Sequence, residues 1–131
     1  MGDIKEIWVF SSSASVEIYN YAPETVIDSD LLGGFLTALQ QFSLEITQKE
    51  FNNMIIGNDR YMIKKEEGKE FFILGRADAK VSIDIVKTIL SKIYLRFWKE
   101  YSQYIRNFQG NIKYFKSFTN IIESLDLTLV T

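Results

Sequence analysis

Two aspartates, Asp78 and Asp84, are the residues of this sequence whose positions best suit acid–base chemistry. They flank the expected start of a helix in GRADAKVSID, and a carboxylate placed there could give or accept a proton. A simpler explanation is that Asp78 belongs to a polar connection and Asp84 to a first helical turn, where the helix dipole favours negative charge. We therefore expect neither aspartate to be catalytic.

The residue types on which most familiar hydrolases depend are missing. The chain has neither histidine nor cysteine, which excludes Ser-His-Asp and Cys-His sites, zinc sites of the usual ligand types and thiol redox centres. It has no G-x-x-x-x-G-K-[ST] loop, and its glycine pair, Gly33-Gly34, lies inside a helical pattern. We predict a protein that is not an enzyme and that uses no cofactor and no metal.

Length and charge limit the kinds of partner that this protein is expected to have. The 131 residues, of which 47% are hydrophobic, suit one globular domain spanning residues 1–131. Fifteen basic and 17 acidic residues give a net charge of -2, without the basic block that follows nucleic acid. No apolar run approaches the roughly 20 residues of a membrane helix, and MGDIKEIW lacks the charged-then-apolar pattern of a signal sequence. A cytoplasmic protein is expected, with any membrane association made through a partner.

Alternating and helical patterns predict an α+β fold. Strands are expected at 4–10, 15–21, 51–57, 60–66 and 69–77, with turns at Asn58-Asp59 and Glu67-Gly68, and helices are expected at 30–46, 81–106 and beyond residue 111. The first strand is apolar on both faces and should be central, whereas the second suits a sheet edge. The element order ββαβββαα predicts a three-layer domain: a five-stranded antiparallel sheet with the first helix on one face and the last two on the other.

The two C-terminal helices each have a predicted core face. In the long helix this face comprises Ile83, Val86, Leu90, Ile93, Tyr94, Phe97, Trp98, Tyr101 and Tyr104, and in the last helix Tyr114, Phe115, Phe118, Ile121, Ile122 and Leu125. Lys87, Lys92, Arg96 and Lys99 are expected on the outer side of the long helix. They could contact anionic lipid, although the net charge and the lack of an expected exposed aromatic on that side count against it.

The first helix, in DLLGGFLTALQQF, contains Gly33 and Gly34 although each glycine costs roughly 1 kcal/mol relative to alanine. An apolar arc of roughly 160° at 100° per residue is expected to face the sheet; it comprises Leu31, Leu32, Phe35, Leu36, Ala38, Leu39, Phe42 and Ile46. We predict an interaction surface on the remaining side, made of Gly33, Gly34, Thr37, Gln40, Gln41 and Leu44. Alternatively, the glycines only let the chain bend into the helix.

Three stretches resemble the longin domains of membrane-traffic proteins, in particular the stand-alone longin-like proteins of Asgard archaea. They are IKEIWVFSSS, SDLLGGFLTALQQFSLEI and GKEFFILGRADAKVSIDIVKTILSKI. The resemblance implies a non-catalytic, profilin-like (longin/roadblock) module that pairs with a copy of itself or with a longin-type partner through the first helix and the neighbouring edge strand. It also implies a small GTPase as a partner, in vesicle trafficking or GTPase regulation.

Two further functions remain open from the sequence. A coat-adaptor-like small subunit would use the same longin-type fold. A small-ligand sensor would enclose an apolar ligand between the sheet and the aromatic long helix.

Overall fold

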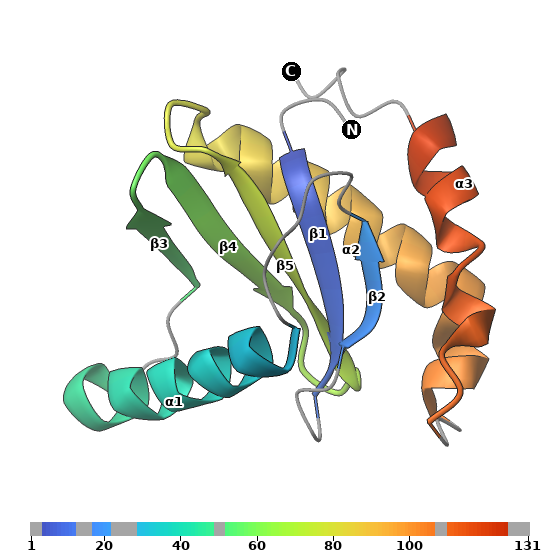
Figure 1. Cartoon of the computed structure of the whole chain (residues 1–131), viewed down its shortest axis with the longest axis horizontal. Helices are drawn as coiled ribbons and strands as arrows, with labels where there is room; N and C mark the ends of the chain where they lie inside the picture. Colours follow the sequence, from blue (N-terminus) through green and yellow to red (C-terminus); the bar gives the residue numbers. More distant parts are fainter. Residues whose placement is uncertain (1–3, 13–16, 22–28, 49–51, 107–109, 126–131) are drawn as a thin grey trace.

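The computed structural model describes residues 4–12, 17–21, 29–48, 52–106 and 110–125. The elements in chain order are β1 (Ile4–Ser11), β2 (Glu17–Tyr21), α1 (Ser29–Thr47), β3 (Asn53–Ile56), β4 (Asp59–Lys65), β5 (Phe71–Asp78), α2 (Ile83–Arg106), the 3-10 turn η1 (Lys113–Phe115) and α3 (Phe118–Ser124) (Figure 1). The order matches the prediction, except that the last helix is divided into η1 and α3. The predicted strand start at 15 and 16 lies outside the described residues.

The five strands form one antiparallel sheet in the order β2-β1-β5-β4-β3. β1 pairs with β2 on one side and with β5 on the other, so the first strand is interior and the second is an edge, as predicted. The strands β3, β4 and β5 form the expected meander. Its first turn is Gly57-Asn58 and not Asn58-Asp59, because Ile56 pairs with Asp59 and Gly57 adopts the positive φ of +61°.

The helices cover opposite faces of the sheet (Figure 1). β1 shows why: Ile7 and Val9 belong to the core beneath α2 and α3, whereas Trp8 and Phe10 pack in a smaller core with Leu32 and Leu36 of α1. Alternate side chains of a strand point to opposite faces, so a strand that is apolar on both faces needs a cover on each. The predicted three-layer arrangement is therefore confirmed.

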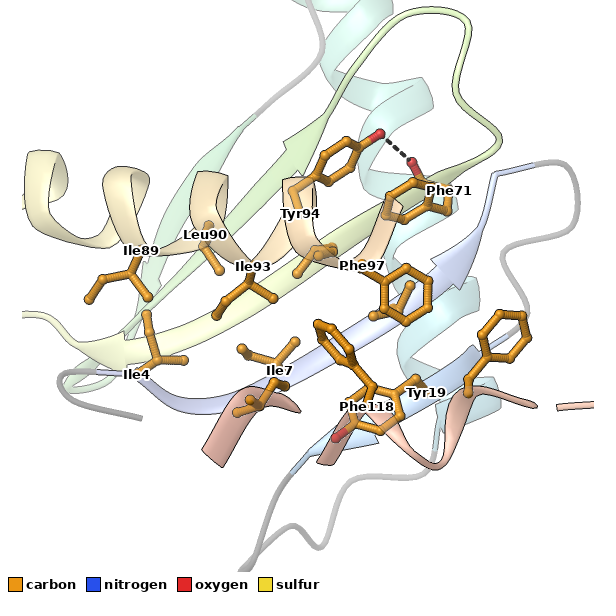
Figure 2. Packing of buried hydrophobic residues seen from close by; sticks show 14 of the residues in the cluster. Ile4, Ile7, Tyr19, Phe71, Ile89, Leu90, Ile93, Tyr94, Phe97 and Phe118 are labelled. Carbon is orange, nitrogen blue, oxygen red and sulfur yellow. Dashed lines mark hydrogen bonds between the residues drawn. The ribbon is translucent and has the colours of Figure 1, made fainter. Parts of the chain in front are cut away.

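Aromatic rings in stacked and edge-on pairs fill the space between the sheet, α2 and α3 (Figure 2). The rings of Phe71 and Tyr94 lie 4.2 Å apart between centroids, and those of Phe97 and Phe118 lie 4.9 Å apart. The Tyr94 hydroxyl donates a hydrogen bond to the Phe71 carbonyl at 3.1 Å. Burial raises the pKa of Tyr94 to about 12, so this donor keeps its proton across the physiological range.

The predicted core faces of α2 and the last helix are correct in part. Ile83, Tyr104 and Tyr114 are exposed, whereas Ile89 and Ile105, which the pattern missed, are buried. Trp98 is only partly buried. None of the helices among the described residues combines the length and the apolar composition that crossing a bilayer requires.

We expect Gly75→Ala to destabilise the fold, because Gly75 lies in the central strand directly under α2. A Cβ at this position would lie 2.6 Å from Cδ2 of Leu90, and Leu90 is fully buried, so its side chain has little room to move. The cost of such overpacking is about 1–3 kcal/mol in the free energy of unfolding, measurable by urea denaturation. Adding Leu90→Val should recover part of the loss; equal stability of Gly75→Ala and the wild type would contradict the packing.

Candidate interaction surface

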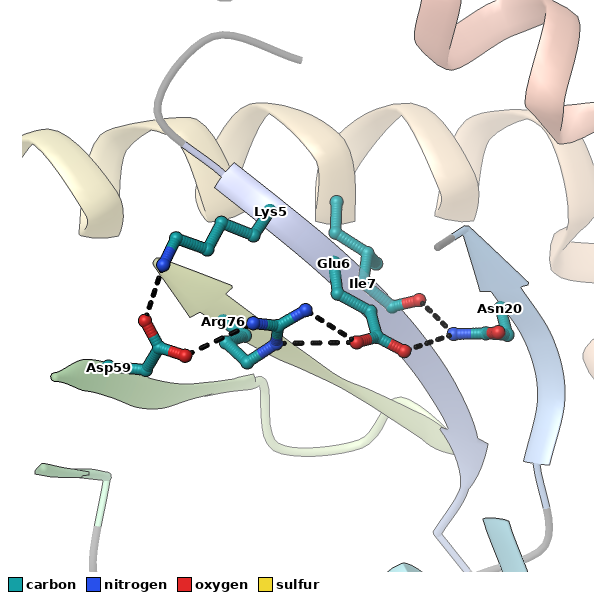
Figure 3. A network of polar contacts seen from close by, with 6 residues as sticks. All are labelled: Lys5, Glu6, Ile7, Asn20, Asp59 and Arg76. Carbon is teal, nitrogen blue, oxygen red and sulfur yellow. Dashed lines mark hydrogen bonds and ion pairs between the residues drawn. The ribbon is translucent and has the colours of Figure 1, made fainter. Parts of the chain in front are cut away.

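A row of polar side chains links four neighbouring strands of the sheet (Figure 3). Two nitrogens of Arg76 on β5, Nε and Nη2, lie 3.3 and 3.0 Å from Oε1 of Glu6 on β1. The third guanidinium nitrogen, Nη1, contacts Asp59 on β4 at 3.1 Å, and Lys5 contacts the same carboxylate at 2.6 Å. Asn20 on β2 donates to Glu6 at 3.3 Å. The row therefore crosslinks β2, β1, β5 and β4.

This row is suited to holding strands together. Glu6 is only 1% exposed, and a buried carboxylate is tolerated when it is paired with a cation and hydrogen-bonded. Hydrogen bonds from Lys5 and from Arg76 hold the pKa of Asp59 below its usual value. Because the pKa of Asp59 is lowered in the folded state, its contacts with Lys5 and Arg76 stabilise the fold at neutral pH. This stabilisation is lost as the pH falls through the lowered pKa.

Asp78 and Asp84 have local structural contacts. Asp78 Oδ1 accepts a hydrogen bond from the backbone N–H of Lys80 at 2.8 Å, which shapes the connection before α2. The backbone N–H of Asp84 donates to the Ser82 hydroxyl at 3.2 Å, and Asp84 lies in the first turn of α2. These are the roles in a polar connection and a first turn that the sequence favoured over catalysis.

The orientation of α1 differs from the prediction, and Gly33 does not lie on the outer surface. Gly33 is buried, whereas Gly34 is exposed and a Cβ added to it would meet nothing within 4 Å. Of the predicted apolar arc, only Leu32 and Leu36 are buried. The helix is therefore rotated about its axis, so that one edge of the arc and the buried glycine face inward.

The other predicted site residues line a hollow between α1 and the sheet. Thr37, Gln40, Gln41 and Leu44 surround about 180 Å³ together with side chains of β4 and β5, among them Ile63 and Phe72. Thr37, Gln40 and Leu44 were predicted on the side of α1 away from the sheet and Gln41 on the flank. Thr37, Gln41 and Leu44 are exposed and Gln40 is half-buried, but because the helix is rotated they border this hollow. Contact of these residues with a partner stays a prediction.

The rotation exposes a line of apolar side chains that the sequence had assigned to the core. Leu31 is 72% exposed, Phe35 47%, Phe42 61% and Ile46 61%, and Ala38 between them is also exposed. The spacing 31-35-38-42 places these side chains on one side of a helix. We call Leu31, Phe35, Ala38, Phe42 and Ile46 the α1 stripe; Gly34 and Gln41, both exposed, lie beside it.

One feature of the sequence could have indicated the α1 stripe. A helix that packs on a single core needs an apolar arc of little more than about 100°, but the predicted arc covers roughly 160°. The additional width of the arc corresponds to a second line of apolar side chains beside Leu32 and Leu36. An arc of this width is what a helix with two apolar contacts would have.

The element order, the sheet order and the division of the helices between two faces define a three-layer α+β domain. Among solved structures, the fold is similar to that of MglB from Myxococcus xanthus, with a TM-score of 0.47 and 16% sequence identity over 93% of this chain and 85% of that chain. No protein-family model matches the sequence, and no curated protein matches it.

Proposed function

We propose that this chain is a non-catalytic protein-interaction module that pairs with a second copy of itself through the α1 stripe. The observation that carries the proposal is the exposure of Leu31, Phe35, Phe42 and Ile46 along one side of α1. Monomeric proteins seldom leave contiguous large apolar side chains in water, and such patches mark interaction sites. A second copy presents the same stripe, so two helices can bury one against the other.

The expected size of the interface supports a contribution from β3. The 19 residues of α1 span about 28 Å, and a stable complex buries about 800 Å² per partner, so we expect a contact wider than one line of side chains. α1 runs below the sheet toward the side of β3 (Figure 1). β3 is an edge strand with Ile55 52% and Ile56 50% exposed, and it can extend the same contact.

The measurement that tests self-association is sedimentation velocity over a range of protein concentrations. We expect a species of twice the 15.2 kDa of one chain, with a monomer appearing on dilution. A monomer at every concentration would remove the homodimer. If that monomer pairs with a longin-type chain of the same organism, the α1 stripe serves a heterodimer.

The resemblance to longin domains favours a small GTPase as the further partner of the pair. A pull-down with small GTPases from the same organism, loaded with GDP or with a GTP analogue, tests this part separately. Binding that depends on the nucleotide would support a role in GTPase regulation. Equal absence of binding in both states would exclude that role and leave the dimer unaffected.

The small-ligand sensor is less well supported. Its ligand was expected between the sheet and the long helix, but this space is filled by the rings of Phe71, Tyr94 and Phe97. The hollow beside α1, about 180 Å³, is smaller than the about 300 Å³ at which small-molecule sites begin. A second pocket, about 460 Å³ and lined by Ile18 of β2 and by Ile105 and Arg106 of α2, exceeds that size, so ligand binding there is the form of the sensor that a thermal-shift screen would test.

A further inference from the structure

Charge is distributed unevenly along this chain. Residues 80–116 contain eight lysines and arginines and two acidic residues, whereas the rest of the chain contains seven basic and fifteen acidic residues. This basic segment includes α2, which covers the face of the sheet opposite to α1. The basic residues are therefore concentrated in and after α2, whereas acidic side chains such as Glu66, which pairs with Lys69 at 3.1 Å, lie in other parts of the chain.

The outward line of α2 combines this charge with an exposed apolar side chain. Lys92, Leu95 and Lys99 follow one another at spacings of three and four residues, which places them on one side of the helix. Leu95 is 66% exposed. Next to this line, the Arg96 guanidinium lies 3.2 Å from the Glu100 carboxylate, so at this point of the helix one acidic group offsets one of the cations.

Trp98 adds an aromatic ring near Leu95, one helical turn further along α2. The ring is partly buried against Phe71, and two cations lie over it: Lys69 Nζ at 5.2 Å and the Arg106 guanidinium carbon at 5.1 Å from the centroid. The sequence pattern had assigned Trp98 to the core face, and no aromatic side chain was expected beside the lysines. We call Lys92, Leu95, Trp98, Lys99 and Arg106 the α2 outer surface.

We propose that the α2 outer surface docks on an anionic lipid bilayer. An anionic headgroup layer attracts clustered lysine and arginine side chains, and the exposed Leu95 side chain can enter the boundary between headgroups and acyl chains. The core face of α2 is fully occupied by the protein itself, so the helix lies on the bilayer surface without inserting. A helix that lies flat on a planar layer of headgroups touches it along the whole helix. Side chains several turns apart can therefore reach the headgroups together.

The experiment is flotation of the wild-type protein with vesicles. Vesicles of phosphatidylcholine and phosphatidylserine in equal parts should carry the protein upward at low salt, and vesicles of phosphatidylcholine alone should not. Binding should fall steeply with added salt because exposed charges are screened. Lys99→Glu should lower the partition onto anionic vesicles about tenfold, and Leu95→Ser should lower it further when the two changes are combined.

Lys65→Glu is the matched control. It changes the net charge by the same amount, but Lys65 lies on β4 beside the hollow under α1, on the opposite face of the sheet. Equal losses for Lys65→Glu and Lys99→Glu, or no flotation with anionic vesicles, would overturn the proposal. Binding to soluble polyglutamate without binding to vesicles would also overturn it, in favour of an acidic protein partner. Dimerisation is measured without lipid, so its failure is distinguishable from failure of the membrane contact.

Discussion

Phe42→Glu is expected to convert the dimer into a monomer while leaving the melting temperature nearly unchanged. Phe42 is 61% exposed in the single chain, so its loss removes little of the chain's own packing. In the dimer it would lie within the contact of the two α1 helices, where a carboxylate without a partner is costly. An aromatic anchor of an interface contributes at least about 2 kcal/mol, and the dissociation constant should rise about 30-fold or more.

Sedimentation velocity and thermal unfolding of the same preparation separate the two effects. Leu95→Glu is the matched control, because Leu95 is 66% exposed on α2 and lies outside the α1 stripe. This control should remain a dimer. A dimer of unchanged affinity in Phe42→Glu, or equal weakening by both substitutions, would exclude the α1 stripe as the contact.

Arg76→Ala is expected to lower the free energy of unfolding by about 3–5 kcal/mol, the usual cost of removing one partner of a buried ion pair. The substitution would leave the Glu6 carboxylate, which is 1% exposed, with Asn20 as its remaining side-chain partner in this row at 3.3 Å. It would also remove the 3.1 Å contact with Asp59. Urea denaturation at neutral pH measures the loss.

Removing both buried charges distinguishes an uncompensated charge from lost packing. Glu6→Gln combined with Arg76→Met leaves no unpaired ion between β1 and β5, so much of the stability should return. Arg76→Lys keeps the charge but cannot reproduce two contacts to one carboxylate, and an intermediate loss is expected. A change below about 0.5 kcal/mol for Arg76→Ala, the range of an ordinary surface substitution, would show that the ion pair contributes nothing.

The fold could be predicted from local patterns because each element matches its own environment. β1 alternates Ile7 and Val9 with Trp8 and Phe10, and this alternation alone requires an interior strand covered on both faces. The turn residues predicted the first turn of the meander to within one position. The prediction was Asn58-Asp59, whereas the turn is Gly57-Asn58, in which Gly57 has the positive φ.

The site could not be predicted in the same way because periodicity does not determine rotation. The arc of α1 contained two apolar lines, and hydrophobicity could not tell which line meets the sheet. The bulky Trp8, Phe10 and Leu74 of the sheet face pack with Leu32 and Leu36, which settles the rotation through contacts distant in sequence. The same rotation buries Gly33, so Gly33 is not part of an exposed contact surface and its substitution would not test the interface directly.

The positive charge of the α2 outer surface could not be predicted from composition, for a related reason. Composition sums over the whole chain, and 15 basic against 17 acidic residues reads as nearly neutral. The placement of α1 and α2 on opposite faces shows that the basic residues of α2 lie on the side of the sheet away from α1. A partner at the surface responds to the nearest charges, because the field of exposed charges decays over about 10 Å in salt.

The two edges of the sheet differ in a way that limits how large an assembly can grow. At the β2 edge, the Tyr19 hydroxyl and Thr119 of α3 lie 2.8 Å apart, and the Tyr21 hydroxyl donates to Glu123 of α3 at 3.3 Å, so a helix is held alongside that strand (Figure 1). At the other edge, β3 has only four residues. A chain that could add copies at both edges would build an open fibril. The proposed pairing, extended by β3 at one edge only, would use the same surface on both copies, close on a two-fold axis and stop at two.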